Sequence, residues 1–260
     1  VLSQRTTTDH KWTNAVRLIA ASPGMIGAAQ LAASGALRAG AGMVVVSSPT
    51  INLQSNDMPP EAVQRKITAA TLVPEVLKDL DRFAALLIGP GLGTDPETVA
   101  MTAELIERSP IPTVVDADGL MAVATHPTCV IRSASTTVLT PHDGEFEKLT
   151  GSPPALDRCA AVRSAAKNSA VLLKGPTTLV SDTNGDLIFV RNANQRLATA
   201  GTGDVLTGII GAVIRNTPIH LAAAAAAHWH GQAAQLAQPD MTASDLPLLL
   251  QSARSEMLTK

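Results

Sequence analysis

The run Gly201-Thr202-Gly203-Asp204 contains the residue types that phosphoryl transfer requires. Glycines let the backbone approach a phosphate, and the free amides at the start of a helix favour an anion. A carboxylate in the same turn could accept the proton of an attacking hydroxyl. From the residue types alone, two roles for Asp204 are equally favoured. It could be this catalytic base, or it could be an acid that only stabilises its own helix. The small residues from Val205 to Ala212 tilt the balance toward chemistry, because they allow close packing beneath the loop.

Two further glycine-rich turns, residues 22–27 and 89–93, fall where a strand should end and a helix should begin. In open α/β sheets, ligands bind outside the carboxyl ends of the strands. Each turn taken singly could be only a tight connection, whereas three together favour a phosphate-bearing ligand. Neither the dinucleotide fingerprint nor the P-loop spacing occurs, so a different phosphate-binding fold is required.

The elements that must position these turns are short apolar runs bounded by glycine and proline, alternating with longer alanine-rich segments. This alternation predicts βαβ units around a mostly parallel sheet. The expected strands are residues 16–20, 43–47, 85–88, 113–115, 137–139, 171–174, 178–180 and 187–190. The expected helices are residues 26–39, 96–108, 144–150, 156–168, 204–215 and 220–237. The last two strands should form an antiparallel hairpin, with Asn184 and Gly185 at positive φ, which makes the sheet mixed.

The composition is that of one globular domain over residues 1–260. Hydrophobic residues make up 45% of the chain, which excludes global disorder, and no low-complexity linker divides it. A net charge of −2 gives no strong field for a polyanion. With 2% aromatic residues and no tyrosine, the stacking platforms that bind single-stranded nucleic acid are missing as well. We therefore expect no nucleic-acid partner.

The cysteines and the apolar stretches indicate the compartment. Cys129 and Cys159 cannot form a disulfide framework, so a reducing, cytoplasmic setting is expected. Residues 1–17 are charged and lack an apolar run, so neither a signal peptide nor a membrane anchor is expected there. His228 and His230 interrupt the apolar stretch 221–237, which is therefore predicted to be a buried amphipathic helix. The two histidines point to different faces and cannot share a metal, and no residue is predicted as a metal ligand.

Six segments occur in an order that resembles a known family. They are residues 24–29 with 37–42, 89–93, 115–120, 139–146, 173–178 and 198–208. Together they resemble the NAD(P)H-hydrate dehydratases of the ribokinase-like superfamily. The resemblance implies a ribokinase-like three-layer α/β sandwich, in which a central, mostly parallel sheet carries helices on both faces.

The resemblance also implies an activity and its partners. Such an enzyme dehydrates the S form of NADH hydrate or NADPH hydrate, with ADP (ATP in some relatives) as phosphoryl donor, and releases AMP and phosphate. Mg²⁺ would bridge the phosphates. A homo-oligomer, more specifically a homotetramer, is implied. Many relatives carry an epimerase domain ahead of this one, for which we expect no room in 260 residues.

Site residues follow from the matched segments. Asp204 would be the catalytic base, with the loop residues Gly201, Thr202 and Gly203 binding the transferring phosphoryl group. The residues implied for the adenine nucleotide are Lys174, Gly175, Pro176, Thr177, Thr178 and Gly203. The residues implied for the hydrated dinucleotide are Ala28, Gly91, His142 and Asp204. The chain departs from the family pattern at Trp12, Asp143 and Ala200.

Several interpretations stay open at this stage. A small-molecule kinase of the same superfamily, acting on an alcohol such as a hydroxyethylthiazole, would need the same base and glycine loop. A nucleotide-binding protein without catalysis is the third candidate. Asp116 and Asp118 are favoured as turn residues, with a water-mediated Mg²⁺ role as the alternative. Glu145 could cap the following helix or orient Lys174, and His142 could be a capping residue or a ligand contact.

Overall fold

The computed structural model describes residues 6–131, 136–154 and 156–259. Nine strands form one sheet in the order β3-β2-β1-β4-β5-β6-β7-β8-β9. The strands are β1 (Ala15–Ile19), β2 (Met43–Ser47), β3 (Ala62–Gln64), β4 (Ala85–Ile88), β5 (Thr113–Val115), β6 (Thr137–Leu139), β7 (Ala170–Leu173), β8 (Thr178–Ser181) and β9 (Leu187–Val190). Neighbouring strands from β3 to β7 pair in parallel, whereas β8 pairs antiparallel with both β7 and β9. The predicted mixed sheet is confirmed.

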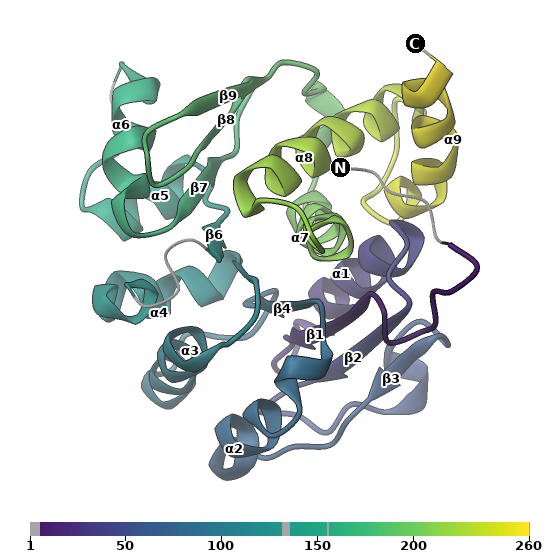
Figure 1. Ribbon diagram of the computed structural model, residues 1–260, viewed down its shortest axis with the longest axis vertical. Coiled ribbons are helices and arrows are strands. Elements are labelled where there is room, and N and C mark those ends of the chain that lie inside the picture. The colour runs from purple at the N-terminus through teal and green to yellow at the C-terminus, as the bar shows by residue number, and fades with distance from the viewer. Residues whose placement is uncertain (1–5, 132–135, 155, 260) are drawn as a thin grey trace.

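Helices cover both faces of the sheet (Figure 1). One layer contains α1 (Ile26–Arg38), α7 (Thr202–Val213), α8 (Ile219–Leu236) and α9 (Asp245–Thr259). The other contains α2 (Leu72–Leu77), α3 (Pro96–Arg108), α4 (Leu120–Thr125), α5 (Asp143–Thr150) and α6 (Arg158–Ala165). The expected three layers are confirmed.

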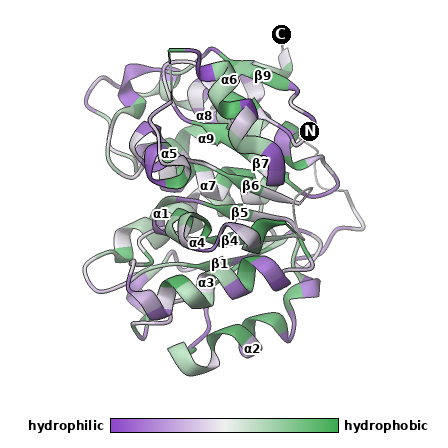
Figure 2. Cartoon of the chain, turned by 90° about the vertical axis from the view of Figure 1, so that its left-hand side faces the viewer, coloured by the Kyte–Doolittle hydropathy of each residue, from purple (hydrophilic) through white to green (hydrophobic). Residues whose placement is uncertain are grey.

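Alternate residues of each central strand supply the two cores between these layers. In β1, Val16 and Leu18 pack beneath α1 and α7, whereas Ala15 and Ile19 face the opposite helical layer. This alternation follows from the two-residue period of a strand. All five residues of β1 are buried, as a central parallel strand requires. Figure 2 shows the hydrophobic colour concentrated along the strands and the inner sides of the helices.

The predicted elements all occur, with ends that shift by up to three residues, and one strand and three α-helices of the described residues were not predicted. The strand β3 and the helices α2, α4 and α9 are the additions. The helix predicted for residues 204–215 begins two residues earlier, at Thr202, and ends at Val213. In the β8–β9 turn only Gly185 has a positive φ (87°), so the prediction for Asn184 was wrong. The Asp182 carboxylate holds that turn by accepting the amide of Asn184 at 3.0 Å.

The predicted close packing beneath the glycine loop is also confirmed. A Cβ added to Gly208 of α7 would lie 2.6 Å from the amide nitrogen of Ala36 in α1. Likewise, a Cβ at Gly35 of α1 would lie 2.5 Å from the carbonyl oxygen of Val205 in α7. The two helices therefore meet backbone to backbone, and only glycine fits at these contacts.

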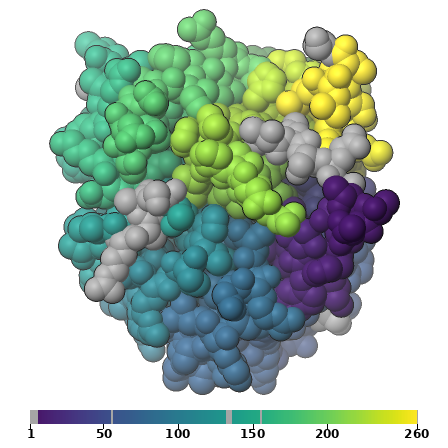
Figure 3. Space-filling view, viewed as in Figure 1, coloured from purple at the N-terminus to yellow at the C-terminus, as the bar shows by residue number. Residues whose placement is uncertain are grey.

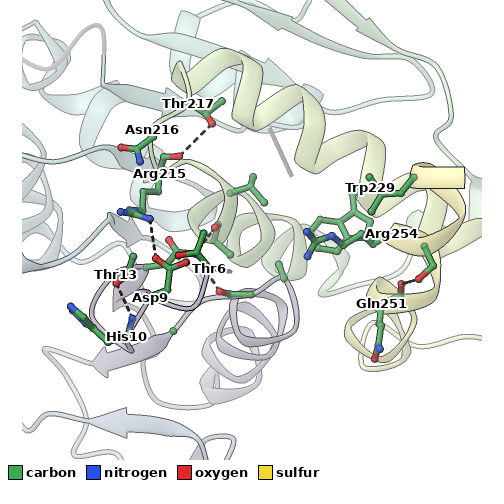
Figure 4. A pocket seen from close by; sticks show the side chains of 18 residues that line it. Thr6, Asp9, His10, Thr13, Arg215, Asn216, Thr217, Trp229, Gln251 and Arg254 are labelled. Carbon is green, nitrogen blue, oxygen red and sulfur yellow. Dashed lines mark hydrogen bonds and ion pairs between the residues drawn. The ribbon is translucent and has the colours of Figure 1, made fainter. Parts of the chain in front are cut away.

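The first and last parts of the described chain lie on the same side of the molecule (Figures 1 and 3). Residues 1–5, part of the N-terminal segment considered above, lie outside the described residues. A cavity of about 940 Å³ opens near this side, where the Arg215 guanidinium points toward Asp9 at 3.9 Å (Figure 4).

No helix within the described ranges has both the length and the hydrophobicity needed to cross a bilayer. The helix α8, which covers most of residues 221–237, is buried along most of its length as predicted.

Candidate active site

The glycine loop forms the start of α7, as its sequence indicates. Gly201 precedes the helix in the left-handed conformation (φ 90°), and a Cβ there would collide with Leu31 of α1. The hydroxyl of Thr202 donates to the carbonyl oxygens of Leu197 and Thr199, at 2.7 and 3.0 Å. No side chain caps the helix. The Thr202 amide donates to the Thr199 carbonyl oxygen at 3.3 Å, so the amides of Gly203 and Asp204 are those left to bind an anion.

A buried carboxylate anchors a lysine beside this loop. Asp116 follows β5, is 1% exposed, and accepts a hydrogen bond from the Lys174 ammonium at 2.9 Å. The hydroxyls of Thr140 and Thr207 donate to the same carboxylate at 2.7 and 2.6 Å. Burial opposes ionisation, but the positive charge of Lys174 and these three hydrogen bonds outweigh it and lower the pKa of Asp116 below its usual range. A Cβ at Gly203 would lie 3.4 Å from the Lys174 ammonium, so the cation directly borders the loop.

Asp204 lies in the first turn of α7, as predicted, and is only partly exposed. Burial, reinforced by the negative charge of Asp116, raises its pKa from 3.8 to about 7. The charges of Glu145 and Asp118 act in the same direction, and Lys174 opposes them. A carboxylate that titrates near neutrality can accept a proton and release it again, as a general base must.

His142 and Glu145 cap α5 reciprocally. The Nδ1 atom of His142 accepts the amides of Gly144 and Glu145, at 3.0 and 3.3 Å. In return, the Glu145 carboxylate accepts the His142 amide at 2.8 Å and lies 3.5 Å from the Lys174 ammonium. Both roles considered for Glu145 are therefore present. The His142 side chain is 59% exposed and thus accessible to a ligand, and its Nε2 atom lies 3.5 Å from Oε1 of Glu145.

Two residues implied for the dinucleotide come together at the carboxyl end of β4. Gly91 has φ 59°, and a Cβ there would lie 3.0 Å from the Cβ of Ala28 in α1. The Asp118 carboxylate accepts the Gly93 amide at 2.9 Å and so fixes this turn. The turn role favoured for Asp118 is thereby confirmed.

The segment implied for the nucleotide connects β7 to β8. It contains Lys174, Gly175, Pro176, Thr177 and Thr178, of which Thr178 is the first residue of β8. The Lys174 amide donates to the Pro141 carbonyl oxygen at 2.9 Å, which places the segment next to the α5 cap. The roles carried over to these five residues stay predictions.

Sequence reasoning missed two parts of this arrangement. Thr207 was counted only as a small residue, although it binds Asp116 from 91 positions away. His230 is 5% exposed and interacts with the main chain of Thr202, and burial lowers its pKa to about 4. It is a packed residue of the predicted helix, and it packs against the glycine loop itself. Within the described ranges, no group of three or more His, Cys, Asp or Glu side chains could hold a metal ion.

Several proteins of known name are similar to this chain in sequence. A family model described as NAD(P)H-hydrate dehydratase matches residues 16–255. The chain is 36% identical to a bifunctional NAD(P)H-hydrate repair enzyme of Moorella thermoacetica, over 99% of this chain and 53% of that protein. It is 38% identical to the enzyme of the same name from Mycobacterium tuberculosis, over 79% of this chain and 42% of that protein. The chain thus spans about half the length of these relatives.

Solved structures share the fold. An ADP/ATP-dependent NAD(P)H-hydrate dehydratase of Bacillus subtilis, co-crystallised with ATP and Mg²⁺, superposes with a TM-score of 0.79 at 27% identity. The alignment covers 97% of this chain and 93% of that one. A ribokinase-like protein of Enterococcus faecalis has a TM-score of 0.80 at 22% identity over 96% and 92% of the two chains, which confirms the ribokinase-like fold. With the family model matched from β1 into α9, the chain belongs to the NAD(P)H-hydrate dehydratase family.

Proposed function

We propose that this chain catalyses the ADP-dependent dehydration of the S form of NAD(P)H hydrate and so restores NAD(P)H. The observation that carries the proposal is that Asp204 and Lys174 both lie beside the start of α7. Asp204 has a pKa raised to about 7 by burial and by the charge of Asp116, and the Lys174 ammonium borders Gly203. A base and a fixed cation beside free helix amides suit phosphoryl transfer to a hydroxyl.

Each group has a defined part in the proposed reaction. The ring hydroxyl attacks the terminal phosphorus of ADP, and its proton passes to the Asp204 carboxylate. The new oxygen–phosphorus bond forms as the bond to AMP breaks, while the amides of Gly203 and Asp204, in the loop shaped by Gly201 and Thr202, bind the phosphoryl oxygens. The carbon–oxygen bond of the phosphate ester then breaks and releases phosphate, a far better leaving group than hydroxide. The neighbouring ring carbon loses a proton to solvent, and the electron pair left behind forms the double bond that restores the dihydronicotinamide ring.

The nucleotide is proposed to bind along Lys174, Gly175, Pro176, Thr177 and Thr178, and the hydrate near Ala28, Gly91 and His142. Mg²⁺ commonly takes one or two carboxylates and completes its shell with phosphate oxygens and waters. Asp118 and Glu145, whose charges both act on Asp204, could hold the ion in that way. Mg²⁺ would neutralise charge on the phosphates. The residues fit an ion that is bound together with the nucleotide rather than by protein ligands alone.

We also propose that residues 1–260 act as one dehydratase domain that assembles into a homotetramer. Exposed leucines on the C-terminal helices support an assembly surface, namely Leu221 at 39%, Leu248 at 61% and Leu258 at 60% exposure. A reducing, cytoplasmic setting agrees with the two free thiols, Cys129 and Cys159.

The decisive experiment follows absorbance at 340 nm while the protein and Mg²⁺ act on NADH hydrate or NADPH hydrate, with ADP, ATP or no nucleotide. We expect nucleotide-dependent recovery of the dihydronicotinamide band, with AMP and phosphate released in equal amounts when ADP is the donor. Phosphorylation of another alcohol without phosphate release would instead identify a kinase. Binding of ADP with no turnover of either kind would identify a non-catalytic nucleotide-binding protein.

A further inference from the structure

An arginine outside the predicted site ties the nucleotide segment to the α5 cap. Arg158, the first residue of α6, donates through Nη1 to both carboxylate oxygens of Asp143, each at 2.8 Å. Its Nη2 atom donates to the carbonyl oxygen of Lys174 at 3.2 Å. A Cβ added to Gly175 would lie 2.9 Å from the same Nη2 atom. The guanidinium group therefore packs directly on the peptide that joins Lys174 to Gly175.

These contacts complete the restraint of Lys174. Its amide donates to Pro141, and its ammonium group binds Asp116 and lies near Glu145. The carbonyl oxygen is the remaining polar group of the residue, and Arg158 supplies its donor. Without Arg158, that carbonyl loses its partner and the bend that begins at Gly175 loses the side chain that packs on it.

The Asp143–Arg158 pair is unsuited to stabilising the whole fold. The Asp143 side chain is 58% exposed and that of Arg158 is 28% exposed. Ion pairs with this much solvent access add little to global stability. The planar fork of arginine does, however, fix geometry when it binds a carboxylate and a carbonyl oxygen together. The contribution of this pair should therefore be local, at the segment that it touches.

We propose that Arg158, held by Asp143, is a positioning residue that fixes the Lys174–Gly175 peptide for binding of an adenine nucleotide. The inference rests on the proposed nucleotide role of residues 174–178. It predicts that Arg158 controls nucleotide affinity without touching the reacting atoms. The affinity for the hydrate should be independent of it, because the His142 cap forms with Gly144 and Glu145 alone.

The test measures the Kd of ADP by titration calorimetry and, in parallel, kcat and the KM of each substrate. Arg158→Ala should weaken ADP binding about tenfold, as expected for loss of hydrogen bonds from a charged donor. At saturating ADP, kcat and the KM of the hydrate should stay within about twofold, and the Tm should change little. Arg158→Lys, which keeps the charge but not the fork, should recover only part of the affinity.

Two further variants separate positioning from a general loss of structure. Asp143→Ala should weaken ADP binding in the same direction, and combining it with Arg158→Ala should add nothing further, because the residues act as a pair. Arg163→Ala is the matched control, since Arg163 lies on the same helix and donates to a carbonyl oxygen at Gly185, in the β8–β9 turn. It should leave the Kd of ADP unchanged.

The outcomes distinguish this inference from the proposed function. The positioning role would be overturned if Arg158→Ala bound ADP within twofold of wild type. If that variant does not fold, the same result in Arg158→Lys and Asp143→Ala would overturn it. An equal loss of ADP and hydrate affinity would also overturn it. If the wild type binds ADP but restores no NAD(P)H, the proposed dehydratase activity fails while the effect on Kd still decides the role of Arg158. A wild type that binds no adenine nucleotide overturns both.

Discussion

Replacing Asp204 by asparagine is expected to abolish dehydration and, in the same variant, to stabilise the fold at alkaline pH. Burial and the charge of Asp116 raise the pKa of Asp204 from 3.8 to about 7. Between these values the folded protein keeps a proton that the unfolded chain releases. The free energy of unfolding of the wild type therefore falls as pH rises from about 4 to about 7.

The size of this effect follows from the pKa. A rise from 3.8 to about 7 corresponds to at most about 4 kcal/mol, since one pKa unit is about 1.4 kcal/mol. With these two pKa values, about 2–3 kcal/mol of the loss should appear between pH 5 and pH 8. Asparagine carries no charge at either pH, so the variant does not lose this stability.

Urea unfolding of the wild type and Asp204→Asn at pH 5 and pH 8, followed by circular dichroism, measures the difference. The stability advantage of the variant should be about 2–3 kcal/mol larger at pH 8 than at pH 5. Its affinity for ADP should stay within a few-fold, because the base acts on the reacting hydroxyl. Asp240→Asn, at an exposed position before α9, is the control and should show no such pH dependence. Wild-type turnover in the variant, or an equal advantage at both pH values, would refute this reasoning.

Three further expectations follow from the same geometry. The kcat/KM for the hydrate should rise about tenfold per pH unit up to about pH 7 and then level off as Asp204 loses its proton; a flat profile from pH 5.5 to 8 would contradict its role as base. Gly208→Ala should lower the free energy of unfolding by about 1–3 kcal/mol through overlap with the main chain of α1. Gly27→Ala is the control, because nothing lies within 4 Å of the added carbon, and it should change the free energy of unfolding by less than about 0.5 kcal/mol. If denaturant titration showed equal losses of stability in the two variants, the packing argument would be refuted. Lys174→Met should lower the free energy of unfolding by about 3 kcal/mol, because it leaves Asp116 charged and buried without its partner. Adding Asp116→Asn should recover part of that loss, and a double variant that loses the sum of the two single losses would contradict the pairing.

The elements that could be predicted from sequence are those whose own residues carry a repeated pattern. The long helix α8 and the buried central strands have such a pattern, and their ends were found within a few residues. The strand β3 escaped because it has three residues at the edge of the sheet, none of them buried. The helix α4 has six residues and follows a short helical turn. In α9 only Leu246, Pro247, Leu250 and Ala253 are buried, which leaves a weak apolar stripe.

The same distinction applies within the candidate site. The glycine loop could be predicted because the hydrogen bonds that shape its turn join residues at most five positions apart, such as Thr202 with Leu197. The partner of Lys174 could not, since Asp116 lies 58 positions away on a different strand end. Asp116 was favoured as a turn residue because its loop lacks the further ligands of a calcium-binding loop. Only the parallel sheet, which brings the ends of β5 and β7 to one edge, makes the pair.

The Asp116–Lys174 pair also explains how two aspartates at one site acquire different protonation states. Lys174 and two threonine hydroxyls stabilise the charge on Asp116, which therefore stays ionised although it is buried. That fixed negative charge, added to the burial of Asp204, makes a second charge unfavourable and moves the pKa of Asp204 toward neutrality. A single lysine cannot compensate both carboxylates. The residue that anchors the cation beside the phosphate loop is thus also one of the causes that make Asp204 basic enough to take a proton from a hydroxyl.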